Sequence, residues 1–227
     1  MRRMSKVTTA AVAMGLVVAA CGGNSSGSTT TPTTAATTTT TAATTTTPPA
    51  PQFTDGDLFR AVVMDGDPWA VPVVDVIPFE LTLDDIWPAD VFPDERQVYV
   101  DAGFEAASFG FFGEDDGVLI TGAHLFATAD GADMALTVLE GSFSDTDLIA
   151  EITGLAPGAL TDFELVDVGL GDRAVGVILT GAEVQVVGIV WITGNLLQFV
   201  RAGMDLGDED RASAAFDVAA AMAGRME

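Results

Sequence analysis

Residues 22–51 form a low-complexity stretch that limits where a folded domain can lie in this 227-residue chain. Residues 29–47 are almost entirely threonine and alanine, and prolines 48, 49 and 51 end the stretch. Such a composition offers too little apolar surface to offset the conformational entropy lost on ordering. It predicts a disordered Thr/Pro-rich tether, either a plain spacer or an extended stalk that accepts O-linked sugars. The folded domain is therefore expected to begin near Phe53.

A short apolar run lies before the tether. Arg2, Arg3 and Lys6 are followed by 14 uncharged residues, 7–20. This pattern is typical of a secretory signal peptide, and the run is too short for a transmembrane helix. We therefore divide the chain into a predicted signal peptide at 1–20, a tether at 21–52 and a single domain at 53–227.

The apolar run ends in Val18-Ala19-Ala20-Cys21, which resembles the lipobox of bacterial lipoproteins. The resemblance implies a diacylglycerol on the Cys21 thiol and cleavage before Cys21, with acyl chains such as palmitate as the anchor. Two or three acyl chains hold a protein firmly, whereas one alone is marginal. The expected location is therefore the cell membrane, on its extracytoplasmic face. The alternative is a buried or reactive free thiol; as the only cysteine, Cys21 leaves no intrachain disulfide.

The charge balance is strongly acidic, with 33 acidic residues against 9 basic ones. Removal of the signal peptide leaves six basic residues against the same 33 acidic ones, a formal charge of −27. Such a field repels phosphate backbones and anionic membrane surfaces, which argues against nucleic-acid partners. The acidity serves solubility or, alternatively, attracts cations or basic partners.

Hydrophobic periodicity after Phe53 predicts an α+β domain. The expected strands are 103–112, 117–128, 163–168, 174–180, 184–193 and 196–203, with an irregular strand at 71–79. The expected helices are a short turn capped by Thr82 and three longer ones at 130–139, 144–152 and 208–226. The predicted architecture is an antiparallel sheet with two strands, a helical crossover, a four-strand meander and a covering C-terminal helix.

Strand 184–193 is predicted to lie at the centre of this sheet. It has Val184, Val186, Val190 and Ile192 on one face and Val187, Ile189 and Trp191 on the other, as in strands covered on both sides. Residues 184–200 carry no charge, but Gly194-Asn195 and two glutamines argue against a membrane span. For the last helix, one apolar stripe is expected: Ala212, Ala215, Phe216, Ala219, Met222 and Ala223.

Four short motifs between residues 80 and 226 carry a further resemblance. They are Leu83-Asp84-Asp85-Ile86-Trp87-Pro88, Ala102-Gly103-Phe104, Leu170-Gly171-Asp172 followed by Ala174, and Gly194-Asn195. Together they resemble extracytoplasmic domains of actinobacterial lipoproteins, whose architecture is similar to the PsbP-like fold and to extracellular sensor-like domains of mycobacteria. Ile192-Thr193 depart from the pattern, since relatives often carry arginine there. The motifs imply a fold rather than a catalytic site.

The inventory of catalytic residue types is small. His124 is the only histidine, and it shares a strand face with apolar residues, which favours a strand-edge or partly buried structural role. The predicted domain at 53–227 contains no Gly-x-Ser-x-Gly elbow, His-Glu-x-x-His motif, paired Cys-x-x-Cys or phosphate loop. We assign no catalytic residue and no cofactor, and do not expect an enzyme.

Clustered carboxylates raise the question of calcium, which takes oxygen ligands alone. The candidates are Asp55/Asp57, Asp65/Asp67, Glu114–Asp116 and Asp205/Asp208/Asp210, none of which matches a full EF-hand loop. We therefore assign no metal ligand.

Seven aromatic residues are the other candidates for function: Trp69, Trp87, Phe92, Phe109, Phe111, Phe112 and Trp191. They either pack in the core or line an apolar cleft between sheet and helix that accepts a lipid or small ligand. The function predicted from the sequence is non-catalytic binding or sensing of a small apolar ligand or an envelope protein. The alternatives are a carboxylate-dependent hydrolase of cell-wall polymers and a purely structural surface protein.

Overall fold

The computed structural model describes residues 52–69, 71–73, 76, 78–90, 92–114, 117–142 and 160–226. A seven-stranded antiparallel sheet with the order β1-β2-β3-β7-β6-β5-β4 is its central element. The strands are β1 (Phe79–Leu81), β2 (Phe104–Glu114), β3 (Gly117–Phe126), β4 (Leu160–Val166), β5 (Arg173–Gly181), β6 (Val184–Thr193) and β7 (Leu196–Asp205). The helices are η1 (Asp55–Arg60, a 3-10 helix), α1 (Leu83–Ile86), α2 (Pro93–Asp101), α3 (Ala129–Ser142) and α5 (Glu209–Gly224).

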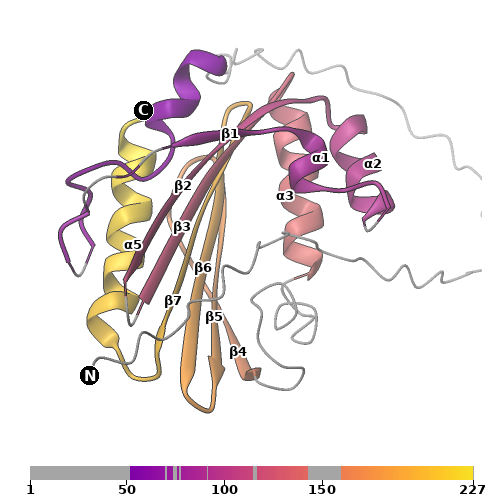
Figure 1. The fold of residues 1–227 in the computed structure, drawn as a ribbon. Helices are drawn as coiled ribbons and strands as arrows, with labels where there is room; N and C mark the ends of the chain where they lie inside the picture. Colours follow the sequence, from indigo (N-terminus) through magenta and orange to yellow (C-terminus); the bar gives the residue numbers. More distant parts are fainter. Residues whose placement is uncertain are drawn as a thin grey trace, which may run out of the picture. The chain divides into compact units, whose positions relative to one another are not determined.

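Helices pack on both faces of the sheet (Figure 1). On the α3 face, α1, α2 and α3 cover a core that includes Trp87, Tyr99, Phe126 and Phe199. On the α5 face, α5 covers a second core around Trp191, beside the N-terminal segment with η1. This two-sided burial explains why β6 and β7 are apolar on both faces.

Local sequence signals fix the ends of several helices. Thr82 and Asp85 form a reciprocal capping box at the start of α1. Pro93 begins α2, where a missing N–H costs nothing, and Gly103 with φ of +73° follows its last turn. At α5, the Asp208 carboxylate accepts a hydrogen bond from the Arg211 amide.

The structure confirms the predicted α+β class, the antiparallel sheet, the helical connection and the C-terminal covering helix. The six longer strands lie where the pattern predicted them, and β4 to β7 form the expected meander. The hairpin of β6 and β7 turns at Gly194-Asn195. No described helix is long and apolar enough to span a membrane.

One helix was not predicted, one predicted strand needs correction, and one predicted helix lies outside the described residues. Helix α2 was not predicted. Of the expected strand at 71–79, the described residues 71–73, 76 and 78 are not in a strand, and β1 begins at Phe79. In segment 71–79, prolines at 72 and 78 lack the N–H that a strand ladder needs. The helix expected at 144–152, the signal peptide, Cys21 and the tether all lie outside the described residues.

The apolar stripe of α5 is wider than predicted and rotated. Ala215, Ala219, Met222 and Ala223 are buried as expected, but so are Arg211, Ala214 and Val218, whereas Ala212 and Phe216 are only partly buried. In an alanine-rich helix the residue types mark the buried face poorly, because alanine is tolerated on both sides.

Candidate functional site

Asn195, in the β6–β7 turn, is a buried hydrogen-bonding centre. Its side-chain amide donates to the carbonyls of Phe53 and Phe126, and its carboxamide oxygen accepts from the Phe53 amide at 2.7 Å. The backbone carbonyl of Asn195 also accepts from the Phe126 amide. This one side chain therefore joins the start of the domain to β3 and to the hairpin.

The Gly171-Asp172 turn is bonded to the same hairpin. Gly171 has φ of +55°, and a Cβ there would lie 2.1 Å from the Ile192 carbonyl oxygen. The Asp172 amide donates to that oxygen, and the Asp172 carboxylate accepts from the Gly194 amide at 2.7 Å. Two of the motifs that carried the sequence resemblance thus hold two turns together, a structural role.

Two buried side chains join the N-terminal segment to the α5 face. Gln198 donates to the Ala61 carbonyl and accepts from the Trp191 indole, and the Thr121 hydroxyl oxygen accepts from the Val63 amide. Each of these polar groups is satisfied, as burial requires. None of them faces solvent.

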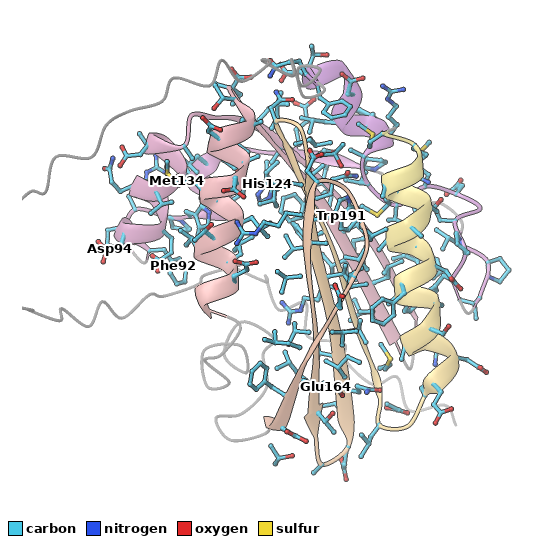
Figure 2. The ribbon with its side chains drawn as sticks, turned by 180° about the vertical axis from the view of Figure 1, so that it is seen from behind. Phe92, Asp94, His124, Met134, Glu164 and Trp191 are labelled. Carbon is cyan, nitrogen blue, oxygen red and sulfur yellow. The ribbon has the colours of Figure 1, made fainter. Side chains whose placement is uncertain are left out.

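His124 lies deeper than the edge or partly buried position expected from the sequence. It is in β3, an interior strand, is 2% exposed and contacts the rings of Tyr99, Phe109 and Phe199. Its Nδ1 lies 3.1 Å from the Tyr99 hydroxyl, while Nε2 has no hydrogen-bond partner among the described residues. Figure 2 shows His124 on the α3 side of the sheet and Trp191 on the α5 side.

Burial sets the protonation of this pair. Desolvation lowers the pKa of His124 to about 3, so the ring is neutral at physiological pH. Desolvation also raises the pKa of the Tyr99 phenol, and the neighbouring Trp87 indole offsets only part of that rise. A group that does not titrate near pH 7 and is shut off from solvent is poorly placed to exchange protons with a substrate.

Of the acidic clusters considered for calcium, Glu114–Asp116 falls largely outside the described residues, and each of the other three has at least one carboxylate engaged in local structure. Asp57 accepts from the Thr54 amide, which lowers its pKa, and pairs with Arg60. Asp65 accepts from the Val76 amide, and Asp67 pairs with Arg225. In the described part of the chain, no group of three or more His, Cys, Asp or Glu is arranged to hold a metal.

Asp208, from the last of these clusters, has the same local role. The hydrogen bond from the Arg211 amide lowers its pKa, and its carboxylate also pairs with the Arg211 guanidinium at 2.6 Å.

The predicted aromatic residues separate into two groups. Trp69, Trp87, Phe109 and Trp191 are buried, Phe92 and Phe112 are partly buried, and Phe111 is 55% exposed. Core packing therefore explains most of them. Phe111 is the exception, and it belongs to an exposed apolar surface on the α3 face that the sequence analysis did not predict.

Exposed apolar side chains lie near both edges of the sheet on the α3 face. Phe111 pairs across the strands with Ile120 of β3, and the exposed Phe79 of β1 stacks on Phe109 with ring centroids 6.2 Å apart. Leu165 is 61% exposed on the same face, but it belongs to β4, at the opposite edge of the sheet from β1 and β2. Only the cross-strand register reveals the grouping of Phe79, Phe111 and Ile120, because these residues come from three strands.

Comparisons with known proteins add little to this geometry. No family model matches the chain, and no curated protein matches it. Among solved structures, the extracellular domain of PknH from Mycobacterium tuberculosis matches with 12% identity and a TM-score of 0.48. The match covers 76% of this chain and 98% of that chain. So distant a match carries no argument about function.

Proposed function

We propose that this protein is a lipoprotein held by acyl chains on Cys21 at the extracytoplasmic face of the cell membrane. Its folded domain binds or senses a small apolar ligand without catalysis. The positive leader, the apolar run and the lipobox-like Val18–Cys21 support the anchor. The PsbP-like assignment belongs to the same proposal and is supported by the structural roles of the Gly171-Asp172 and Gly194-Asn195 motifs.

The observation that carries the binding role is the apolar surface on the α3 face. Phe79 and Phe111 are 46% and 55% exposed and lie on the neighbouring strands β1 and β2 of this face, where Phe79 is opposite Phe109 and Phe111 is opposite Ile120. Exposed apolar groups that cluster on one face mark interaction sites more often than chance. The side chains of Asn195, Gln198 and Asp172, in contrast, form hydrogen bonds within the fold. An envelope protein is the alternative occupant of the same surface.

The anchor is tested in cells that express the full chain. Globomycin, which blocks lipoprotein signal peptidase, is expected to shift the protein to its larger, unprocessed form, as seen by immunoblot. Cys21→Ser is the control and is expected to show no drug-dependent shift. An unchanged wild-type band under the drug rules out the anchor.

The binding role is tested by native mass spectrometry of the processed chain, residues 21–227. The spectrum after incubation with a host lipid extract is expected to contain an adduct of small-molecule mass. Phe111→Ser is expected to reduce the adduct, and Phe59→Ser, which alters a 57% exposed residue on η1, is the matched control. No adduct, or equal adducts in both variants, argues against a ligand on this surface.

A further inference from the structure

Arg201 differs from every other arginine of the predicted mature chain. The other five pair with carboxylates: Arg60 with Asp57, Arg96 with Asp84, Arg173 with Asp133 and Glu140, Arg211 with Asp208, and Arg225 with Asp67. Arg201 forms no ion pair and donates no hydrogen bond to the described residues. In a chain with 33 acidic residues, an arginine without a carboxylate partner in the described structure is notable.

The position of Arg201 links it to the apolar surface. It lies on the α3 face of β7, opposite Ile120 of β3 and Gly188 of β6, and Ile120 is in turn opposite the exposed Phe111. Phe111 is thus two strands away, about 10 Å at the usual strand spacing. Gly188 and Gly203, its neighbours on β6 and along β7, contribute no side chain beside the guanidinium stem.

The surroundings of Arg201 are mostly apolar, yet part of the side chain stays accessible. Desolvation lowers the pKa of Arg201 to about 10, so the guanidinium remains charged at pH 7. A desolvated charge without a partner is costly, and an apolar residue in its place is often neutral or stabilising. Its presence is explained if a bound anion completes its hydrogen bonds.

We propose that Arg201 binds the anionic head group of an acyl-chain ligand, a carboxylate or a phosphate, whose chain lies along Ile120 and Phe111. The inference rests on the proposed function and specifies the ligand chemistry. A guanidinium donates two parallel hydrogen bonds to either head group. The net charge of the domain disfavours polyanions, so a ligand with one head group and a long apolar part fits best.

The test uses the processed chain with Cys21→Ser, which contains every described element and adds no acyl group of its own. Dodecanoate, dodecyl phosphate and dodecanol are titrated by calorimetry below their micelle concentrations. At least one of the two anions is expected to bind about tenfold or more tightly than the alcohol; comparison of the two identifies the head group. Arg201→Met is expected to remove the preference, and Arg60→Met, the matched control, to retain it.

Thermal unfolding without ligand separates this role from a structural one. Arg201→Met is expected to melt at the wild-type temperature or above, whereas loss of a structural arginine lowers it. Arg201→Lys keeps the charge but lacks the planar guanidinium that donates two parallel hydrogen bonds. This variant is expected to bind dodecanoate more weakly than wild type does. A preference for anions that survives Arg201→Met, or a much lower melting temperature in both variants, overturns the inference. If dodecanol binds as tightly as the anions, the inference fails and the proposed function stands; if nothing binds, both fail.

Discussion

At the scale of single residues, the buried polar side chains of this domain divide into paired and unpaired groups. Asn195 and Gln198 satisfy their amides with backbone carbonyls and other partners from distant segments. His124 keeps one ring nitrogen without a partner in the described core, and its burial makes it an acid-sensitive element. The sole histidine therefore affects stability, and its effect on stability can be measured.

Substitution of His124 by glutamine is expected to remove a pH dependence of stability. The folded-state pKa is about 3, whereas the unfolded chain has the ordinary value of about 6.5. Below pH 6.5 the His124 ring is protonated in the unfolded state but stays neutral in the folded state. The free energy of unfolding therefore falls as the pH drops from about 6.5 towards 3. Between pH 7 and pH 5 the loss is about 2 kcal/mol. Urea unfolding at pH 5, 6 and 7 measures it; the same slope in wild type and His124→Gln contradicts the assignment.

At the scale of secondary-structure elements, local signals predicted what depends on local sequence. The β-branched residues and Gly194-Asn195 predicted the β6–β7 hairpin, and Thr82 predicted the start of α1. Helix α2 was missed although Pro93, Asp94 and Glu95 form a helix start, because the whole helix has only nine residues and weak apolar periodicity. The pairing of β3 with β7 is non-local, and no local pattern specifies it.

Gly131 shows how packing between elements overrides helix propensity. A Cβ at this position in α3 would lie 2.0 Å from the carbonyl oxygen of Ala102, the residue that ends α2. Alanine in a helix is worth up to about 1 kcal/mol over glycine, but overpacking against backbone costs about 1–3 kcal/mol. Gly131→Ala is therefore expected to destabilise the domain by about 1–2 kcal/mol.

Gly224→Ala is the matched control for this prediction. Gly224 ends α5, and a Cβ added there would meet no atom within 4 Å, so alanine is expected to be neutral or slightly stabilising. Chemical denaturation of both variants measures the difference. Equal stability of the two variants shows that α3 shifts freely relative to α2.

At the scale of the whole domain, the cross-strand register of the sheet places Arg201 beside the apolar surface. Phe111, Ile120, Arg201 and Leu165 belong to four strands, and the antiparallel pairings place them in one row across the sheet. The sequence indicates an apolar strand around each of them but not which residues face one another. Similarly, the lack of a carboxylate partner for Arg201 among the described residues is a property of three-dimensional neighbours, which explains why sequence reasoning did not single it out.

Arg225, at the end of α5, fastens the first segment of the domain to the last. It pairs with Asp67, whose side chain is 8% exposed, and donates to the carbonyls of Arg60 and Val62. Arg225→Met leaves a largely buried carboxylate and two carbonyls without these donors, at a cost of about 2 kcal/mol. The lost stability is expected to concern residues 53–67, which detach before the sheet unfolds, because the ion pair and hydrogen bonds of Arg225 hold only this segment.

Hydrogen exchange and limited proteolysis test whether the opening is local. In Arg225→Met, amides of residues 57–67 are expected to exchange faster and the Phe59–Met64 region to be cut first, while β6 and β7 keep their protection. Arg60→Met removes an exposed ion pair with Asp57 and is expected to change stability by no more than about 0.5 kcal/mol. Faster exchange throughout β6 and β7 in Arg225→Met would show instead that the clamp supports the whole sheet, since the segment also contributes Ala61 and Val63 to the α5 face through Gln198 and Thr121.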